Sequence, residues 1–380
     1  MEKLLEVKNL KTYFYTDDGI VKAVDGVDFS LGKGDTLGLV GESGCGKSVM
    51  ALSLIGLVPR PGKIVGGEIY FKNRNLLDIG EEEIRGIRGK EISMIFQDPF
   101  TSLNPVFTIG EQIREAVEIH SSGPDCSVRS GAIHRTNLFC SSPLAGEVRC
   151  SSDSVSPKGI GDKGEGCSGP PACLRQADGG ATKEQLFNKV VELLKLVELP
   201  FPEQYYHYYP HQLSGGMQQR AMIAMALSCN PSLLIADEPT TALDLTIQSQ
   251  IIKLLQKLQA KLDMSVILIT HNLGVVSEIA KSVIVMYLGR MMEYACTDDL
   301  FKNPAHPYTQ GLLNAIPRVS AESKEGRRLY VIPGTVGSPL NLPSGCRFYP
   351  RCEKRIEKCL QEEPPLKEVN ANHLARCWLV

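Results

Sequence analysis

The chain has 380 residues, of which 43% are hydrophobic, and its 41 basic and 43 acidic residues leave a formal net charge of −2 at pH 7. This length and composition predict a globular protein with one large domain and a smaller one, and the balanced charge argues against an electrostatic nucleic-acid binder. The mixed-charge start lacks a signal-peptide pattern and no run approaches the ~18 apolar residues of a membrane span, so we expect a cytoplasmic protein that reaches a membrane only through partners.

Short strands separated by a turn at 17–19 are predicted for residues 3–35, because apolar and polar residues alternate there. We interpret this stretch as an antiparallel layer in front of the glycine-rich segment that follows. Three aromatic residues lie in it, Tyr13, Phe14 and Tyr15. An aromatic ring can stack on a nucleotide base, and we assign this role to Phe14, with ordinary strand-edge packing as the alternative.

The segment 41–48 reads Gly-Glu-Ser-Gly-Cys-Gly-Lys-Ser and has the spacing G-x-x-x-x-G-K-[ST] of a phosphate-binding loop (P-loop). It follows an apolar run at 37–40 and precedes a helical pattern at 49–57, which is the context that the motif requires; a turn without a ligand is the alternative. Glycines let backbone N–H groups face the phosphates, and the helix N-terminus adds partial positive charge. Lys47 can reach the β- and γ-phosphates, and the Ser48 hydroxyl can bind Mg²⁺. The residues expected to bind ATP here are Gly41, Ser43, Gly44, Cys45, Gly46, Lys47, Ser48 and Val49.

A strand pair is predicted around 64–77, and a buried strand at 92–96 ends before Gln97. The proline at position 99 stops regular pairing there. In an open α/β sheet, a side chain at the carboxyl end of a strand faces the ligand crevice. Gln97 is therefore a candidate for contact with Mg²⁺ or with the attacking water, although a surface glutamine is the simpler interpretation of this residue by itself.

The composition changes sharply after a helical pattern at 108–120. Residues 121–182 are rich in serine, glycine and proline and show no apolar periodicity, so they cannot bury enough surface to offset the entropy of ordering. We predict a disordered insertion that loops out between two helices, which a fold tolerates because closing a long loop costs little extra. A metal-binding module is the alternative, although the spacings match no C-x₂-C pattern. Its candidate ligands are Cys126, Cys140, Cys150, Cys167 and Cys173.

An amphipathic helix is predicted at 183–197, and the segment 213–220 then reads Leu-Ser-Gly-Gly-Met-Gln-Gln-Arg. Strong helix formers follow at 221–227, so we expect Ser214 to cap a helix that opens with the two glycines after it. The start of such a helix is a second anion-receptive N-terminus. A plain capped helix start is the alternative.

Four apolar residues at 233–236 predict a central parallel strand with two carboxylates at its tip. Asp237 is placed to hold Mg²⁺ through water, as carboxylates do at this position in P-loop enzymes. Glu238 points elsewhere and can act as the general base for the attacking water. A helix at 247–262 and a buried strand at 266–270 follow. His271 comes at the end of that strand, where it can hold the γ-phosphate and the water; a capped loop residue is the alternative.

Five motifs follow one another in the chain: the P-loop, Gln97, the 213–220 segment, the Asp-Glu pair at 237–238 and His271. In this order they closely resemble the ATP-binding-cassette (ABC) family, and the 213–220 segment resembles its signature loop. The resemblance implies an α/β fold of the P-loop NTPase class, with a RecA-like core, an antiparallel β subdomain and a helical subdomain. It also implies a head-to-tail dimer in which ATP lies between the P-loop of one cassette and the signature loop of the other. Gln97 would lie in the loop that couples to transmembrane subunits, and Asp244 in a loop that crosses the dimer interface. Contacts to the partner's ATP are expected from Ser214, Gly215, Gly216, Gln218 and Asp244.

A finer resemblance is to the ATPase subunits of oligopeptide and dipeptide importers, and it rests on 96–105, 209–212 and above all 306–313, which reads His-Pro-Tyr-Thr-Gln-Gly-Leu-Leu. It implies a peptide-import motor at the cytoplasmic face of the membrane. The implied partners are two permease subunits, a second and paralogous cassette and, indirectly, a solute-binding protein. Nickel importers use similar subunits and remain the alternative. The expected division is an ATPase domain at 1–295, with a helical subdomain at about 98–232, and a C-terminal extension at 296–380.

Twelve cysteines in a cytoplasmic chain indicate metal or redox use rather than structural disulfides. Four of them, Cys346, Cys352, Cys359 and Cys377, lie in a tail with little apolar core, which a metal would stabilise. Four thiolates suit Zn²⁺ or an iron–sulfur cluster, and the long gaps between them favour the bulkier cluster. The resemblance to peptide importers implies a [4Fe–4S] cluster; zinc and free thiols remain alternatives.

Two other functions fit parts of the sequence. A soluble ABC protein that acts on nucleic acid or ribosomes usually carries two cassettes and a basic face, whereas this chain has one cassette and a net charge of −2. A regulator that binds ATP without hydrolysis would not need Glu238 and His271, which are both present. We therefore expect a hydrolysing enzyme that binds no nucleic acid.

Overall fold

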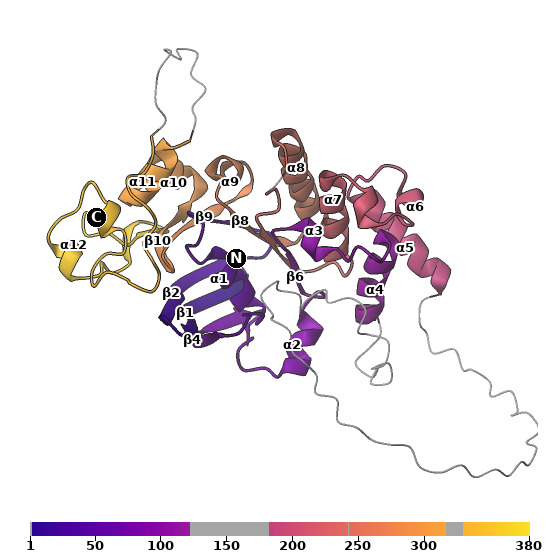
Figure 1. Ribbon diagram of the computed structural model, residues 1–380, viewed down its shortest axis with the longest axis horizontal. Helices are drawn as coiled ribbons and strands as arrows, with labels where there is room; N and C mark the ends of the chain where they lie inside the picture. Colours follow the sequence, from indigo (N-terminus) through magenta and orange to yellow (C-terminus); the bar gives the residue numbers. More distant parts are fainter. Residues whose placement is uncertain (1, 122–181, 242, 317–329) are drawn as a thin grey trace, which may run out of the picture.

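The structure is a computed structural model, and it describes residues 2–121, 182–241, 243–316 and 330–380. The insertion predicted at 121–182, including its five cysteines, lies outside the described residues except for its two end positions. Figure 1 shows an elongated molecule with the C-terminal residues at one end and a group of helices at the other. The sheets lie between these two ends, so they occupy the centre of the molecule.

A four-stranded antiparallel sheet forms the first layer, which confirms the layer expected at the start of the chain. Its strand order is β2-β1-β4-β5. The long strands β1 and β2 are joined by a two-residue turn, and Gly19 after it has a φ of 136°, which favours glycine. The strands are β1 (Lys3–Thr16), β2 (Gly19–Gly32), β4 (Gly62–Phe71) and β5 (Arg74–Asn75).

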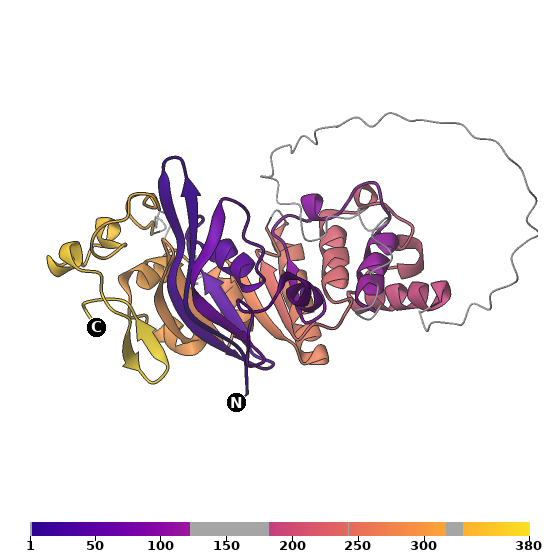
Figure 2. The ribbon, with the colours of Figure 1, turned by 90° about the horizontal axis from the view of Figure 1, so that it is seen from below.

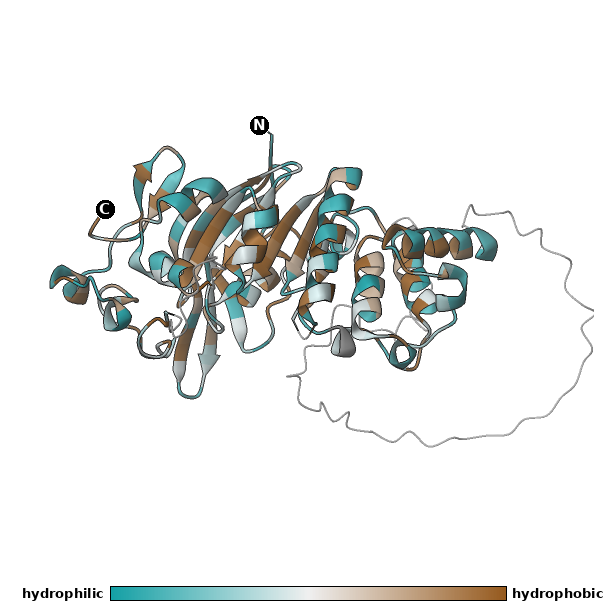
Figure 3. Cartoon of the chain, turned by 90° about the horizontal axis from the view of Figure 1, so that it is seen from above, coloured by the Kyte–Doolittle hydropathy of each residue, from teal (hydrophilic) through white to brown (hydrophobic). Residues whose placement is uncertain are grey.

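The second sheet has eight strands in the order β11-β12-β10-β9-β3-β8-β7-β6. The run from β9 to β6 is parallel, and β3, β6, β7 and β8 are buried along their whole length. Burial on both faces explains why these strands read as unbroken apolar runs, and they appear as brown arrows in Figure 3. The strands are β3 (Thr36–Val40), β6 (Ile92–Ile95), β7 (Leu233–Asp237), β8 (Ser265–Thr270), β9 (Ser282–Tyr287), β10 (Arg290–Cys296), β11 (Lys367–Asn370) and β12 (His373–Ala375).

Helices flank the second sheet and form the end of the molecule opposite the C-terminal residues (Figures 1 and 2). One apolar core fills the space between the two sheets, and another joins the helical end to the face of the parallel strands. The α-helices are α1 (Lys47–Leu54), α2 (Glu81–Ile87), α3 (Pro99–Ser102), α4 (Ile109–Ser121), α5 (Lys183–Leu196), α6 (Pro202–Tyr205), α7 (Gly215–Ala226), α8 (Leu245–Leu262), α9 (Leu273–Ile279), α10 (Thr297–Lys302), α11 (Pro307–Asn314) and α12 (Lys358–Gln361). Two short 3₁₀ helices are η1 (Pro210–Gln212) and η2 (Tyr349–Arg351).

The C-terminal residues continue the second sheet. Strand β12 pairs with β10, and β11 pairs with β12. The parts of the chain before and after the expected boundary at 295/296 therefore share one sheet. A third apolar core joins β9 and β10 to α11 and to the cysteine-containing tail. This pairing covers an edge strand that would otherwise present unpaired N–H and C=O groups.

Candidate functional site

The P-loop connects β3 to α1, and the close approach of neighbouring backbone requires glycine at two places in it. Gly46 has a φ of 101°, and a Cβ there would lie 2.1 Å from the Ala23 carbonyl oxygen. Gly41 has a φ of 153°, and a Cβ there would lie 2.3 Å from the Met286 carbonyl oxygen. At Gly44, by contrast, a Cβ would meet nothing within 4 Å, so this part of the loop has open space beside it. The loop is therefore fixed against two neighbouring strands and remains accessible at its middle.

Lys47 supplies the positive charge of the loop. Only 5% of the residue is exposed, and its Nζ donates to the carbonyl oxygens of Gly41 at 2.9 Å and Glu42 at 3.0 Å. These bonds hold the ammonium inside the curve of the loop, next to the N-terminus of α1. A cation and a helix N-terminus at one point form a site for phosphate groups.

Asp237 and Ser48 form the next part of the site. Asp237 ends β7 with 4% of its surface exposed, and its Oδ1 has no hydrogen-bond partner among the described residues. Burial raises the pKa of Asp237 to about 6, against the opposing effect of a hydrogen bond from the Ser48 hydroxyl. A buried carboxylate oxygen without a partner, beside a hydroxyl, fits a divalent cation. Two of the three predicted Mg²⁺ ligands are thus brought together.

Two of the three predicted catalytic residues, Gln97 and His271, lie against the carboxylate of the third, Glu238. Oε2 of Glu238 accepts from Nε2 of Gln97 at 3.0 Å and from Oγ1 of Thr241 at 3.0 Å. Its Oε1 lies 3.5 Å from Nδ1 of His271. Glu238 has a φ of 46°, a conformation that non-glycine residues adopt rarely and that active sites often contain. Thr241 was not among the predicted site residues; the available signal was a pair of threonines, at 240 and 241, shortly after the Asp-Glu pair.

The residue before α7, Ser214, has a side-chain hydroxyl that makes no hydrogen bond to the helix. Ser214 is the N-cap residue of α7, as expected, but its side chain makes no capping hydrogen bond, and the residue is exposed. Gln218 is only 3% exposed, and its Nε2 donates to the carbonyl oxygens of Pro210 at 2.7 Å and Leu213 at 3.3 Å. Gln218 therefore faces its own loop here, which differs from the expected contact with a partner's nucleotide. Asp244 is exposed and caps α8 by accepting from the Ile247 N–H at 2.9 Å.

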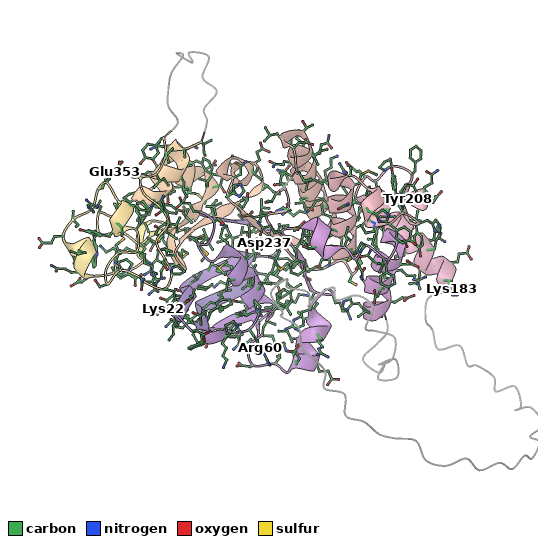
Figure 4. All side chains as sticks on the ribbon, viewed as in Figure 1. Lys22, Arg60, Lys183, Tyr208, Asp237 and Glu353 are labelled. Atoms are coloured by element: carbon green, nitrogen blue, oxygen red, sulfur yellow. The ribbon has the colours of Figure 1, made fainter. Side chains whose placement is uncertain are left out.

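Figure 4 places Asp237 near the middle of the molecule, away from Lys183 and Tyr208 at one end and from Glu353 at the other. The aromatic residues of β1 lie in the first sheet and differ in their surroundings. Tyr13 donates from its hydroxyl to Oδ1 of Asp25 at 2.7 Å, and Tyr15 is 47% exposed. Phe14 is half-buried and pairs with Gly62 across the sheet.

Four cysteines of the tail come together. Cys346, Cys352, Cys359 and Cys377 are all buried and line one small cavity. Burial raises the pKa of Cys346 to about 12 and also raises the pKa values of Cys352 and Cys377, which keeps these thiols protonated at neutral pH. Across the described ranges, no group of three or more His, Cys, Asp or Glu side chains has an arrangement that could hold a metal ion. The cysteines thus share a cavity without forming a ligand set.

Comparison with known proteins identifies relatives of the whole chain. Residues 24–241 match the ABC transporter family, and residues 292–359 match the family described as Oligopeptide/dipeptide transporter, C-terminal region. The chain is 45% identical to the oligopeptide transport ATP-binding protein AppD of Bacillus subtilis, with 100% of this chain and 97% of that protein covered. It is 42% identical to the dipeptide transport ATP-binding protein DppD of the same organism, with 100% of this chain and 95% of that protein covered.

Solved structures show the same fold. The ATP-binding cassette MJ0796, in a dimeric post-hydrolysis state bound to ADP and Pi, matches with a TM-score of 0.56 and 25% identity, covering 77% of this chain and 98% of that one. The cassette cbiO1 of Clostridium perfringens matches with a TM-score of 0.56 and 21% identity, covering 80% of this chain and 92% of that one. In the part of the chain that the structure describes, no helix has the length and apolar character needed to span a membrane.

Proposed function

The chain belongs to the ABC transporter family, and from this premise we propose that it is the ATP-hydrolysing motor subunit of a peptide importer. The observation that carries the enzymatic part is the convergence of Gln97, Thr241 and His271 on Glu238, one residue after the buried Asp237. The match at 292–359 and the relatives that carry peptides favour peptide over nickel as the solute.

We assign the steps of hydrolysis to the residues as follows. Lys47 and the N-terminus of α1 bind the phosphates and neutralise their charge. Ser48 and Asp237, with Gln97 as a third candidate, would hold Mg²⁺, which supplies positive charge to the transferred phosphoryl group. Glu238 accepts the proton of the attacking water, and His271 orients the water or the γ-phosphate. Phe14 stacks on the base.

The signature loop completes the site from a second cassette. We propose that Ser214, Gly215 and Gly216 contact the nucleotide held by a partner's P-loop, supported by the exposed and uncapped hydroxyl of Ser214. Asp244 would lie at the same interface, at the exposed start of α8. Gln218 shapes the loop from within because its amide is bonded to carbonyl groups of its own chain.

The remaining assembly follows from the family. We propose a paralogous second cassette, two permease subunits that bind near Gln97, and a solute-binding protein on the other side of the membrane, with no nucleic acid involved. The chain would then act at the cytoplasmic face of the membrane as a peripheral subunit. Residues 296–380 would form the family's C-terminal extension, in agreement with the match at 292–359.

Peptide uptake tests this function directly. Cells that lack the chain should lose uptake of a labelled peptide, and the intact chain should restore it whereas a Lys47→Ala variant should not. Nickel uptake, measured in the same cells, should be unchanged. Normal peptide uptake together with lost nickel uptake would favour the nickel importer instead.

For the four cysteines we propose a [4Fe–4S] cluster, with zinc as the alternative, and give it no part in hydrolysis. Their shared cavity supports the proposal, but in their present arrangement they do not form a ligand set, so loading would require the thiols to shift and lose their protons. Anaerobic purification should give a brown protein that contains iron and acid-labile sulfide. A colourless protein with bound zinc would refute the cluster and support a zinc site. A protein without bound metal would refute both the cluster and the zinc site.

A further inference from the structure

An ion pair between Arg351 and Glu42 joins the C-terminal region to the P-loop. Nη1 of Arg351 lies 2.6 Å from Oε2 of Glu42, and Nη2 lies 3.0 Å from Oε1. The two residues are 309 positions apart in the sequence, and Glu42 is the second residue of the loop. Two parallel N–H···O bonds fix the carboxylate in position and orientation, which a single contact does not.

Arg351 is itself held firmly. Its side chain is only 5% exposed, its Nε donates to the Pro333 carbonyl oxygen at 2.9 Å, and its guanidinium lies over the Tyr287 ring at 5.8 Å. Glu42 favours the charged guanidinium and raises the pKa of Arg351. The arginine therefore presents a rigid fork to the loop.

Tyr308 binds the backbone of Glu42. Its hydroxyl accepts from the backbone N–H of Glu42 at 2.9 Å. The tyrosine is fully buried, with ring centroids 4.9 Å from Tyr287 and 5.2 Å from Phe348. Side chain and backbone of Glu42 are thus both bound by residues of the C-terminal region.

The carbonyl group of Glu42 carries this restraint into the loop. It accepts from Nζ of Lys47 at 3.0 Å and from the Cys45 N–H at 3.3 Å. A displacement of Glu42 would therefore move the lysine that binds the phosphates. The contacts form one continuous chain from Arg351 through Glu42 to Lys47.

We propose that Arg351 and Tyr308 are positioning residues for nucleotide binding: they hold Glu42, and through it Lys47, in the conformation that receives the phosphates. Without them Glu42 would be held less firmly in the free protein, and the entropy of ordering it when the nucleotide binds would weaken binding. This inference rests on the proposed function, because it takes ATP as the ligand of the P-loop. It also links nucleotide affinity to the tail, since Arg351 directly precedes Cys352.

The test is a titration of the full chain with MgATP and a fluorescent ATP analogue. Arg351→Met should raise the Kd about tenfold, within the usual range of coupling between sites. The matched control is Arg355→Met, which removes the same charge four residues later, where the guanidinium lies 5.6 Å from the Tyr349 ring; its Kd should stay within about twofold of the parent. Tyr308→Phe keeps the ring, loses the hydroxyl and should also weaken binding.

Two further variants separate positioning from folding. Arg351→Lys keeps the charge but not the fork, so its Kd should lie between those of the parent and Arg351→Met. Glu42→Gln tests the pair from its more exposed side, and combining it with Arg351→Met should add little, because both remove one interaction. Unfolding midpoints without nucleotide identify any variant that simply fails to fold.

The outcomes are distinct. If the parent binds the analogue and Glu42→Gln, Tyr308→Phe and a folded Arg351→Met bind it equally well, the positioning role is wrong and the proposed function stands. If the parent itself binds no analogue, the proposed function fails and this inference fails with it. A loss of affinity in Arg355→Met as large as in Arg351→Met would also overturn the inference, because removing any positive charge in this region would then weaken nucleotide binding.

Discussion

Nε2 of Gln97 donates to Oε2 of Glu238 at 3.0 Å, although 141 positions separate the two residues in the sequence. The contact forms because β6 and β7 are parallel neighbours whose carboxyl ends meet at one edge of the sheet. It joins the residue that we propose to lie near the permeases to the residue that we propose as the general base. A movement of one would therefore change the surroundings of the other.

We expect Glu238→Gln to lower kcat for ATP by about 10²- to 10⁴-fold, the usual contribution of general base catalysis. The amide cannot accept the proton of the attacking water, but it leaves the phosphate contacts of Lys47 intact. Phosphate release measures the loss, and sizing with MgATP should show a dimer that persists. Glu203→Gln, an exposed carboxylate on α6, is the control. Undiminished turnover in Glu238→Gln would rule out this residue as the base.

Thr241→Val should lower kcat about tenfold and leave the KM for ATP nearly unchanged. The substitution keeps the shape of the side chain but removes one of the two hydrogen bonds to Oε2 of Glu238, and a bond to a charged group contributes about 1.5–3 kcal/mol. Steady-state kinetics at several ATP concentrations separate the two constants. A raised KM with normal kcat would show that Thr241 acts in binding instead of orienting the base.

The raised pKa of Asp237 predicts a pH dependence of stability without Mg²⁺ or nucleotide. The folded state binds the proton up to about pH 6, whereas an unfolded aspartate releases it near its ordinary pKa of 3.8. The folded state therefore holds more protons between these values, so stability falls as pH rises from about 4 to 6, by about 3 kcal/mol from this residue. This loss of stability persists at pH 7, and it is absent in Asp237→Asn, which has no carboxyl group to titrate.

Thermal unfolding of the parent and of Asp237→Asn from pH 4 to 8 measures this difference. The variant should gain relative stability as pH rises to about 6 and keep the gain above it, while losing Mg²⁺-dependent hydrolysis. A constant difference across the range would show that Asp237 does not titrate with the raised pKa that its burial causes.

His373→Ala should destabilise the protein by about 1–3 kcal/mol, because it removes a hydrogen-bond partner of a buried carboxylate, Glu293, which keeps the backbone N–H groups of Ala305 and His306. Nε2 of His373 lies 2.8 Å from Oε1 of Glu293, which is completely buried in β10, and Nδ1 lies 2.6 Å from Oδ2 of Asp299. The contact between His373 and Glu293 joins β12 to β10, so limited proteolysis should release the C-terminal tail of the variant before it cuts the rest of the chain. His207→Ala, an exposed histidine, is the control. Equal unfolding midpoints for both variants would contradict this role.

The local features of the site were predictable from the sequence because they depend on neighbours in the chain. The P-loop and the N-cap at Ser214 each combine a glycine or capping residue with an adjacent helical pattern, and the strand before Asp237 is an unbroken apolar run. The structure places all three as expected. The antiparallel first layer followed from the alternation of apolar and polar residues, and the α/β fold from the resemblance of the motifs to the ABC family. These features need no knowledge of which strands become neighbours.

Contacts between distant segments were decided by the tertiary structure alone. The tertiary structure brings Gln97 to the carboxylate of Glu238, places Arg351 on Glu42, and lets β12 extend the sheet beside β10. The spacing of the four cysteines suggested a ligand set, whereas their common cavity and the raised pKa values of Cys346, Cys352 and Cys377 are consequences of burial. Periodicity reports which face of an element is buried, but not which partner covers it, and these side chains find their partners only when the sheet has formed.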